Sequence, residues 1–279
     1  MQLLSHWPVE DRRQIIGVFT DIDDTLTTSG AITPEALQAL AELKATGLAV
    51  IAITGRPVGW SEPFALSWPV DAIVAENGAV ALVRQHGGNP HPCPLPEGER
   101  VKKLYQQDGA TRAANFARMQ QVARRVLLEV PGTTLAKDSP GRETDIAIDH
   151  SEFTHLPPDK IAQVVQIMQS AGMCATVSSI HINGWFGAHN KLEGARWIAR
   201  ELLGRALDTE IARWVYVGDS TNDQLMFQHF PQSIGVANIR RFAAELTHSP
   251  RYITQGERGA GFAEMAHALL TARPTGDTR

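Results

Sequence analysis

The sequence predicts an α/β protein: a doubly wound, Rossmann-like parallel sheet as the core, with an α+β domain inserted into it. Three apolar, strand-like runs each end in a polar residue, at Asp21, Thr54 and Asp219. Open α/β sheets bind ligands at the carboxyl ends of their strands, so these three residues are expected in one crevice. The middle of the chain shows another pattern, helix–strand–strand given twice, which predicts the insertion.

A helix with clear end signals follows the first run. Thr33 is a suitable N-cap, Pro34 fits the first turn because its missing N–H needs no partner there, and Gly47 ends the helix. Strand, helix and strand therefore follow one another up to Thr54.

A hairpin is predicted next, because residues 72–83 contain two apolar runs on either side of Asn77-Gly78. Glu76 and Asn77 are explained as turn residues, and the alternative is that one of them faces a ligand at the third strand end.

A linker rich in proline and glycine, residues 86–98, marks the start of the insertion. We predict a core domain of residues 1–87 and 188–279 and an inserted domain of residues 88–187. Inside the insertion the expected elements are helices over about 110–129 and 157–172 and strands near 133–138, 144–150, 174–179 and 181–186.

The composition excludes several classes of function. A net charge of -4 and a pI near 6.2 give no basic excess for nucleic acid or an anionic membrane. Two cysteines, Cys93 and Cys174, fit a reducing compartment. No run approaches the length of a membrane span, and the first residues lack a basic stretch followed by an apolar one. We expect a cytoplasmic protein, a monomer or small homo-oligomer, with a small-molecule partner.

Four polar clusters stand at the predicted strand ends and at one helix start: residues 21–25 (Asp-Ile-Asp-Asp-Thr), Thr54-Gly55-Arg56, Lys191, and residues 218–223 (Gly-Asp-Ser-Thr-Asn-Asp). In order and type they resemble the four motifs of the haloacid dehalogenase (HAD) superfamily of phosphohydrolases, subfamily IIB, Cof-like. The insertion resembles the C2-type cap of sugar-phosphate phosphatases in that superfamily.

The resemblance implies a role for each motif residue. Asp21 would be the nucleophile that forms an aspartyl-phosphate, and Asp23 would be the acid and then the base. Thr54 would bind the phosphate beside the amide of Gly55, and Lys191 would hold both phosphate and Asp21. The role of Arg56 stays open between a phosphate contact and an ion pair.

The resemblance also implies Mg²⁺, a hard cation that prefers oxygen ligands. Asp21 and Asp219 would bind it through side chains, Asp23 through its carbonyl, and Asp223 directly or through water, with Ser220 and Asn222 orienting the site. A lysine at a helix start opposes the helix dipole, so Lys191 is expected to have an anion beside it. Asp24 stands where many relatives have glycine, so the turn is stiffer or an extra acid approaches the metal.

The expected function is a Mg²⁺-dependent phosphatase acting on a small phosphorylated metabolite, a sugar phosphate or a phosphorylated sugar acid. The alternatives are a phosphomutase of the same superfamily and a non-catalytic protein that binds phosphorylated metabolites. In the cap, His181, Asn183 and Trp185 are expected on one strand face, where they either bind the leaving group or form an ordinary solvent-exposed face. Ile182 and Phe186 would face the cap's own core.

Overall fold

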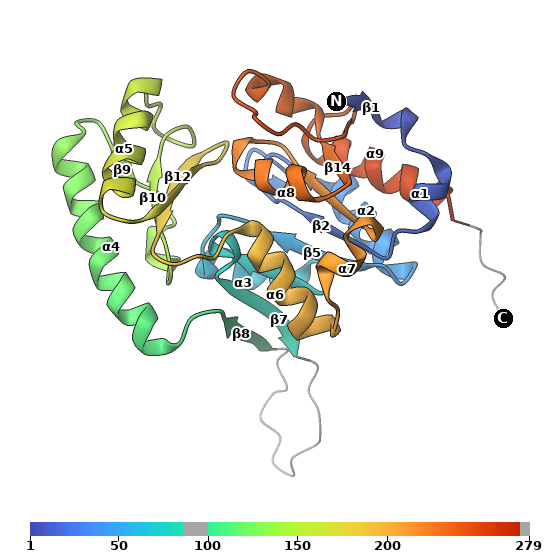
Figure 1. Cartoon of the computed structure of the whole chain (residues 1–279), viewed down its shortest axis with the longest axis horizontal. Helices are drawn as coiled ribbons and strands as arrows, with labels where there is room; N and C mark the ends of the chain where they lie inside the picture. Colours follow the sequence, from blue (N-terminus) through green and yellow to red (C-terminus); the bar gives the residue numbers. More distant parts are fainter. Residues whose placement is uncertain (86–99, 274–279) are drawn as a thin grey trace, which may run out of the picture. The chain divides into compact units, whose positions relative to one another are not determined.

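The computed structural model describes residues 1–85 and 100–273, which divide into two compact units (Figure 1). Unit 1 comprises residues 1–53 and those from 191 onward, and unit 2 comprises residues 54–190. The predicted linker at 86–98 lies outside the described residues. The predicted core and cap divide the chain at other positions, and that division stays a prediction.

Unit 1 contains a parallel sheet with the strand order β1-β15-β14-β13-β2-β5. Its strands are β1 Gln2–Leu3, β2 Gly17–Thr20, β5 Ala49–Ile53, β13 Trp214–Gly218, β14 Gln232–Gly235 and β15 Tyr252–Ile253. In the centre, Val217 of β13 pairs with Thr20 of β2, so the two strands end side by side. The predicted parallel sheet is confirmed, and the residues that follow these two strands, Asp219 and Asp21, leave it at the same edge.

Helices of unit 1 connect these strands, as expected of an α/β fold. They are α1 Val9–Arg13, α2 Pro34–Ala45, α6 Lys191–Leu203, α7 Leu207–Glu210, α8 Gln224–His229 and α9 Arg258–Thr271. Thr33 caps α2 by accepting a hydrogen bond from the Ala36 amide at 3.2 Å, and Gly47 follows the helix with a φ of +80°. Both predicted end signals of α2 are confirmed. A short antiparallel pair, β3 Thr27–Thr28 with β4 Ala31–Ile32, lies between β2 and α2.

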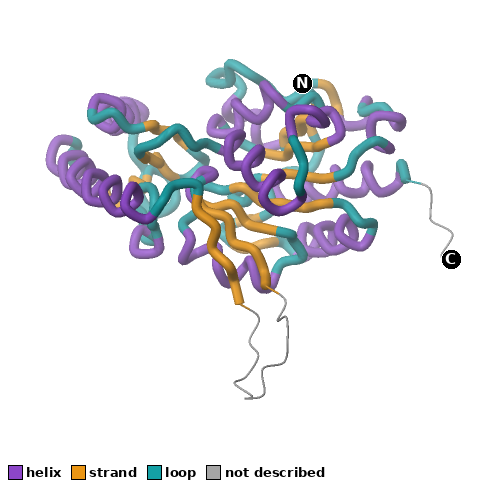
Figure 2. Tube along the Cα trace, turned by 60° about the horizontal axis from the view of Figure 1, so that its bottom comes forward, coloured by secondary structure: helices purple, strands orange, loops and turns teal. Residues whose placement is uncertain are grey.

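Unit 2 contains a three-stranded antiparallel ladder with helix α3 Val58–Ser67 beside it. The strands are β6 Ala72–Ala75, β7 Val80–Gln85 and β8 Arg100–Tyr105. Figure 2 shows β7 and β8 as two long adjacent strands. Glu76, Asn77 and Gly78, between β6 and β7, have φ values of +50°, +55° and +106°. The predicted hairpin is confirmed, with a left-handed turn.

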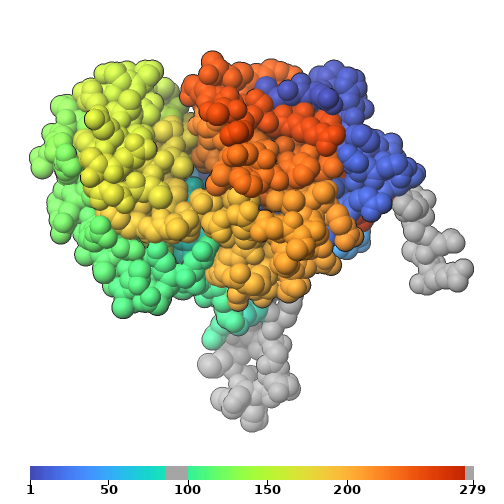
Figure 3. Space-filling model, viewed as in Figure 1, coloured from blue at the N-terminus to red at the C-terminus, as the bar shows by residue number. Residues whose placement is uncertain are grey.

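The rest of unit 2 is a four-stranded antiparallel sheet with two helices. Its strand order is β11-β12-β10-β9. The elements are α4 Gly109–Glu129, β9 Thr134–Leu135, β10 Ile146–Asp149, α5 Pro158–Ser170, β11 Cys174–Val177 and β12 His181–Trp185. They form the predicted helix–strand–strand unit, given twice, around one apolar core. In the space-filling view α4 and α5 (green to yellow) form much of the visible surface of this unit (Figure 3). Among the described residues, no helix has the length and apolar character needed to cross a membrane.

Candidate active site

Three buried carboxylates gather at the ends of β2 and β13 in unit 1. Asp21 follows β2, Asp219 follows β13, and Asp223 closes the 3₁₀ turn Thr221–Asp223. One carboxylate oxygen from each lies within 4.8 Å of the others. The parallel register of β2 and β13 brings Asp21 and Asp219 together, as the strand-end pattern predicts.

Lys191, the first residue of α6, lies among these carboxylates. Its Nζ donates to Oδ1 of Asp21 and to Oδ1 of Asp223, both at 2.6 Å. Burial by itself lowers the pKa of Lys191, but the two negative charges outweigh it and raise the pKa above its ordinary value. The expectation that an anion accompanies this lysine is met by two.

Asp223 holds the turn that carries Asp219. Its Oδ2 accepts the backbone amides of Asp219 at 2.9 Å and of Ser220 at 3.1 Å, while Oδ1 also accepts the Tyr216 hydroxyl. A Cβ on Gly218 would lie 2.4 Å from the Asp223 carboxylate, so this position requires glycine. Both oxygens of Asp223 are therefore used within unit 1.

Asp219 is held through one oxygen only. Oδ2 accepts Nδ2 of Asn238 at 2.9 Å and lies 3.5 Å from Nη2 of Arg241. Oδ1 is buried and has no hydrogen-bond partner among the described residues. A buried, unpartnered carboxylate oxygen is costly unless another group binds it.

A divalent cation fits this cluster. Burial and the neighbouring carboxylates raise the pKa of Asp219 well above its usual range, and burial is also the main cause that raises the pKa of Asp21 to about 7. The negative charge of the half-buried Asp23 also contributes to raising the pKa of Asp21. The single positive charge of Lys191 does not balance these negative charges. A hard divalent cation would balance them, and the lone pairs of Asp219 Oδ1 could bind it.

The structure shows how Asp24 is accommodated at a position where many relatives have glycine. Its φ is +54°, in the left-handed region that glycine adopts most easily. Its carboxylate pairs with Arg241 at 3.0 Å and with Arg258 at 2.9 Å. The extra acid is thus partnered by two arginines while its backbone keeps the conformation that glycine would have.

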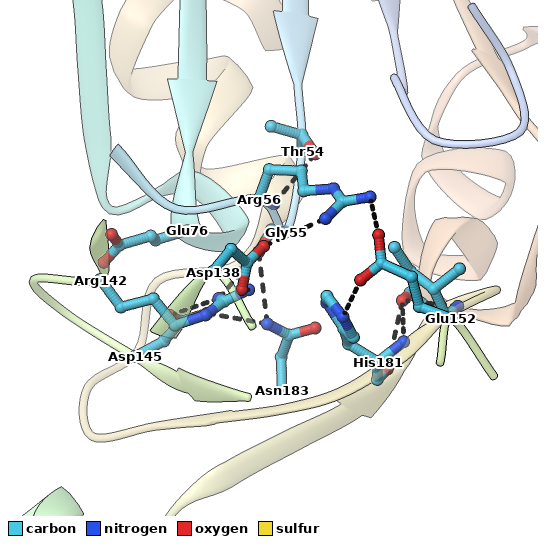
Figure 4. Close-up of polar contacts among 12 residues, drawn as sticks. Thr54, Gly55, Arg56, Glu76, Asp138, Arg142, Asp145, Glu152, His181 and Asn183 are labelled. Carbon is cyan, nitrogen blue, oxygen red and sulfur yellow. Dashed lines mark hydrogen bonds and ion pairs between the residues drawn. The ribbon is translucent and has the colours of Figure 1, made fainter. Parts of the chain in front are cut away.

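Thr54, Gly55 and Arg56 belong to unit 2 and form a loop after β5 (Figure 4). Thr54 Oγ1 accepts the backbone N–H of Arg56 at 3.0 Å. The Arg56 guanidinium pairs with Asp138 at 3.1 Å and with Glu152 at 2.8 Å, and it lies over the Trp60 ring. Of the two roles left open for Arg56, the structure has the ion pair.

Two residues of strand β12 in unit 2 lie near this loop. His181 Nε2 contacts Glu152 at 2.9 Å, and Asn183 Nδ2 donates to Asp145 at 2.9 Å and to the Gly55 carbonyl at 3.3 Å. His181, Asn183 and Trp185 are all buried, so the alternative of an ordinary solvent-exposed sheet face is wrong.

Trp185 corrects another expectation about this strand. It lies in the apolar core of unit 2 with Ile182 and Phe186, the residues expected on the opposite face. Its indole N–H donates to the His189 carbonyl at 2.8 Å, and its ring stacks on the His189 ring. The chain bends at residues 186–188, just after this strand, and the His189 ring lies against the indole, so the ring is covered from within unit 2.

Several residues of these clusters were not predicted as site residues from the sequence. Tyr216 and Asn238 bind the carboxylates of unit 1, while Arg142 and Asp145 meet beside Gly55 in unit 2. Glu76 is used inside unit 2, where its carboxylate accepts backbone amides of the loop after Arg142. In the sequence, only the acidic residue Glu76 in the predicted hairpin turn pointed to this second cluster.

The comparisons with known proteins agree with this fold. A sequence model of the haloacid dehalogenase-like hydrolase family matches residues 18–110, and no curated protein matches the chain in sequence. A Plasmodium vivax protein described as a HAD/COF-like hydrolase is 15% identical, with a TM-score of 0.65 over 95% of this chain and 99% of its own. The sucrose-phosphatase of Synechocystis, solved with sucrose and phosphate, is 16% identical, with a TM-score of 0.61 over 92% and 98%.

A sugar phosphatase of HAD subclass IIB is similar too, at 15% identity and a TM-score of 0.58 over 90% of this chain and 96% of its own. At these identities the likeness concerns the fold, which is the one that the four motifs predict. The matched family segment begins in β2 and contains Asp21, Asp23 and the Thr54 loop. The family model thus matches residues 18–110 of this chain, and the solved structures share the fold of most of its length.

Proposed function

We propose that this protein is a Mg²⁺-dependent phosphatase that hydrolyses a small phosphorylated metabolite through an aspartyl-phosphate on Asp21. The observation that carries the proposal is the buried group of Asp21, Asp219 and Asp223 with Lys191 bonded into it. A phosphate ester repels an attacking carboxylate, so the site needs positive charge beside the nucleophile. Lys191 supplies one such charge, and Mg²⁺ would supply the rest when bound.

The side chains divide the reaction into two steps. An oxygen of Asp21 forms a bond to phosphorus while the ester P–O bond breaks, and Asp23 gives its proton to the leaving alcohol oxygen. Asp23 then takes a proton from water, whose oxygen attacks phosphorus and releases Asp21 and inorganic phosphate. Lys191 holds Asp21 through Oδ1 during both steps.

Other residues would hold the metal and the phosphate. Asp21 and Asp219 would bind Mg²⁺ through carboxylate oxygens and Asp23 through its carbonyl. Asp223 would act through water, because its own oxygens already hold Lys191 and the turn after β13. Thr54 would donate its hydroxyl to the phosphate.

The substrate class proposed is a sugar phosphate or a phosphorylated sugar acid. It rests on the fold shared with the sucrose-phosphatase of Synechocystis and with the subclass IIB sugar phosphatase. A cytoplasmic location and the core and cap boundaries remain proposals from the sequence.

Acid quenching tests the mechanism directly. Wild-type protein with Mg²⁺ and a ³²P-labelled sugar phosphate should yield labelled protein whose peptide map places the label on Asp21. Phosphate release without any bisphosphorylated activator excludes a phosphomutase. A protein that binds the ester but releases no phosphate from a panel of sugar phosphates and phosphorylated acids would contradict the proposal and favour the non-catalytic alternative.

A further inference from the structure

The loop that carries Thr54 is fixed at every carbonyl. The Thr54 carbonyl accepts the Asn77 amide at 2.9 Å, and the Arg56 carbonyl accepts the Glu76 amide at 3.0 Å. These two bonds come from the turn after β6. The carbonyl between them, that of Gly55, is bound by two side chains from later parts of unit 2 instead.

Two cap side chains bind the Gly55 carbonyl. Arg142 Nη1 donates to it at 3.0 Å, and Asn183 Nδ2 donates to it at 3.3 Å (Figure 4). Asp145 lies behind both donors: it accepts Arg142 Nη1 at 2.7 Å and Asn183 Nδ2 at 2.9 Å. The two donors are therefore held by one carboxylate and aimed at one carbonyl.

The planar peptide carries this constraint to Thr54. In a trans peptide the C=O and the N–H point in opposite directions, and the described residues contain no cis peptide. The Gly55 carbonyl faces Arg142 and Asn183, and the N–H of Arg56 in the same peptide faces Thr54 Oγ1 at 3.0 Å. Once that oxygen accepts a hydrogen bond there, its single hydrogen must point elsewhere, which leaves it available to donate to a phosphate oxygen.

We propose that Arg142 and Asn183 are positioning residues that orient the Thr54 hydroxyl by fixing the Gly55–Arg56 peptide. The inference rests on the proposed function, because Thr54 is taken to bind phosphate. It gives Asn183 a role different from direct contact with the leaving group. Asn183 would then affect the binding of the phosphate group itself, independently of which alcohol the phosphate is esterified to.

The packing around the loop leaves little room for another arrangement. A Cβ on Gly55 would lie 3.3 Å from the amide oxygens of Asn183 and Asn77. A Cβ on Gly59, in the first turn of α3, would lie 2.8 Å from the Gly141 Cα, so α3 and the loop that carries Arg142 touch through two glycines. The positions of Gly55 and Arg142 are set by these close approaches as well as by hydrogen bonds.

A double-mutant cycle with inorganic phosphate as the probe tests this chain of contacts. Asn183→Ala keeps the Arg142–Asp145 pair and should still fold. With Mg²⁺ present, it should weaken phosphate binding, measured as product inhibition of p-nitrophenyl phosphate hydrolysis, by about 5-fold or more. In a Thr54→Val background the same substitution should cost less than about 2-fold, because the hydroxyl it positions is gone.

The control is Asn115→Ala. Asn115 Nδ2 also donates within unit 2, but its acceptor is the Gln107 side chain at 3.2 Å and not a carbonyl of the Thr54 loop. This variant should bind phosphate as wild type does. Gly59→Ala provides a second route, because displacing Gly141 should move Arg142 and reproduce the Asn183→Ala phenotype.

Two results would overturn the inference. An equal loss from Asn183→Ala in the wild-type and Thr54→Val backgrounds would show that Asn183 does not act through the hydroxyl. An unchanged inhibition constant for phosphate with a raised KM for a sugar phosphate would show that Asn183 contacts the leaving group. If Thr54→Val alone leaves phosphate binding unchanged, the role given to Thr54 under the proposed function fails instead.

Discussion

Asp24 shows how one residue keeps a backbone conformation that its side chain disfavours. A left-handed φ costs a non-glycine residue roughly 1–2 kcal/mol. Asp24 lowers that cost through two ion pairs, with Arg241 and Arg258, each partly exposed and therefore worth at most about 1 kcal/mol. The turn after Asp23 thus has the backbone geometry of a glycine turn, and its acidic side chain is held in ion pairs with two arginines.

Asp21→Asn should lower kcat by about 10³-fold or more, because an amide cannot attack phosphorus as an anion. The amide nearly matches the carboxylate in size, so far-ultraviolet circular dichroism and the unfolding midpoint should stay close to those of wild type. Asp208→Asn is a matched control on the exposed surface, where Asp208 pairs with Arg196. Near wild-type turnover by Asp21→Asn, with contaminating phosphatase excluded, contradicts the covalent step.

Glu152→Gln tests an electrostatic contribution to stability at the residue scale. Burial alone would raise the pKa of Glu152, but hydrogen bonds from His181 and Arg56 and the Arg56 charge lower it from 4.5 to about 2. A depressed carboxyl pKa stabilises the folded state above pH 4.5, and that stabilisation is lost as the pH falls toward 2.

The free energy of unfolding of wild type should therefore exceed that of Glu152→Gln above about pH 4.5, and the difference should shrink as the pH falls toward 2. Urea titrations at each pH measure both values. A difference that does not change with pH would show that the Glu152 charge contributes nothing beyond packing.

The turn between β13 and the 3₁₀ segment at Thr221 determines the site at the scale of elements. Asp223 reaches back to the amides of Asp219 and Ser220, which is possible because Gly218 has no Cβ in its path. The start of α6 completes the arrangement by presenting Lys191 to Asp223 and Asp21. A strand end, a turn and a helix start thus share one carboxylate.

Gly218→Ala should displace the Asp223 carboxylate, since the new methyl would lie 2.4 Å from its oxygen. We expect weaker Mg²⁺ binding by isothermal titration calorimetry and at least about a 10-fold loss of kcat. Gly109→Ala is the control: its Cβ would meet the Arg112 side chain at an ordinary 3.8 Å. Wild-type metal affinity in Gly218→Ala would show that Asp223 has room to move without consequence.

At the scale of the whole molecule, the two units carry different parts of the proposed chemistry. Unit 1 holds the carboxylates and Lys191, and unit 2 holds the Thr54 loop and the four-stranded sheet β11-β12-β10-β9. The carboxylate cluster is a source of instability without a cation, because buried like charges repel and Asp219 Oδ1 has no partner among the described residues.

Metal should therefore change the order of stabilities. In a chelator, Asp219→Asn should unfold at a temperature roughly 2–4 °C above wild type, since it removes one of the crowded charges. Saturating Mg²⁺ should raise the midpoint of wild type by more than that of Asp219→Asn, because binding stabilises only the state that holds the ion. Scanning calorimetry measures both, and an equal response of the two proteins to Mg²⁺ would exclude Asp219 as a ligand.

The sequence by itself determined the fold class, helix α2, the β6–β7 hairpin and the main charged residues of unit 1. Strand ends, the Thr33 cap and the Asn77-Gly78 turn are local signals, and the parallel order of β2 and β13 brings Asp21 and Asp219 together without further information. The position of Lys191 is also predictable from local sequence, because a lysine at a helix start needs a nearby anion.

Only the tertiary structure decided which side chains meet across elements that are distant in the chain. Asn238 on Asp219 and Arg142 on Gly55 join residues whose separation carries no periodic signal. Trp185 shows the same limit, because strand alternation predicts a face but not what the chain folds over it, here His189. Hydrogen bonds and packing between distant segments depend on the whole fold, so the orientation of the Thr54 hydroxyl could not be inferred from its motif.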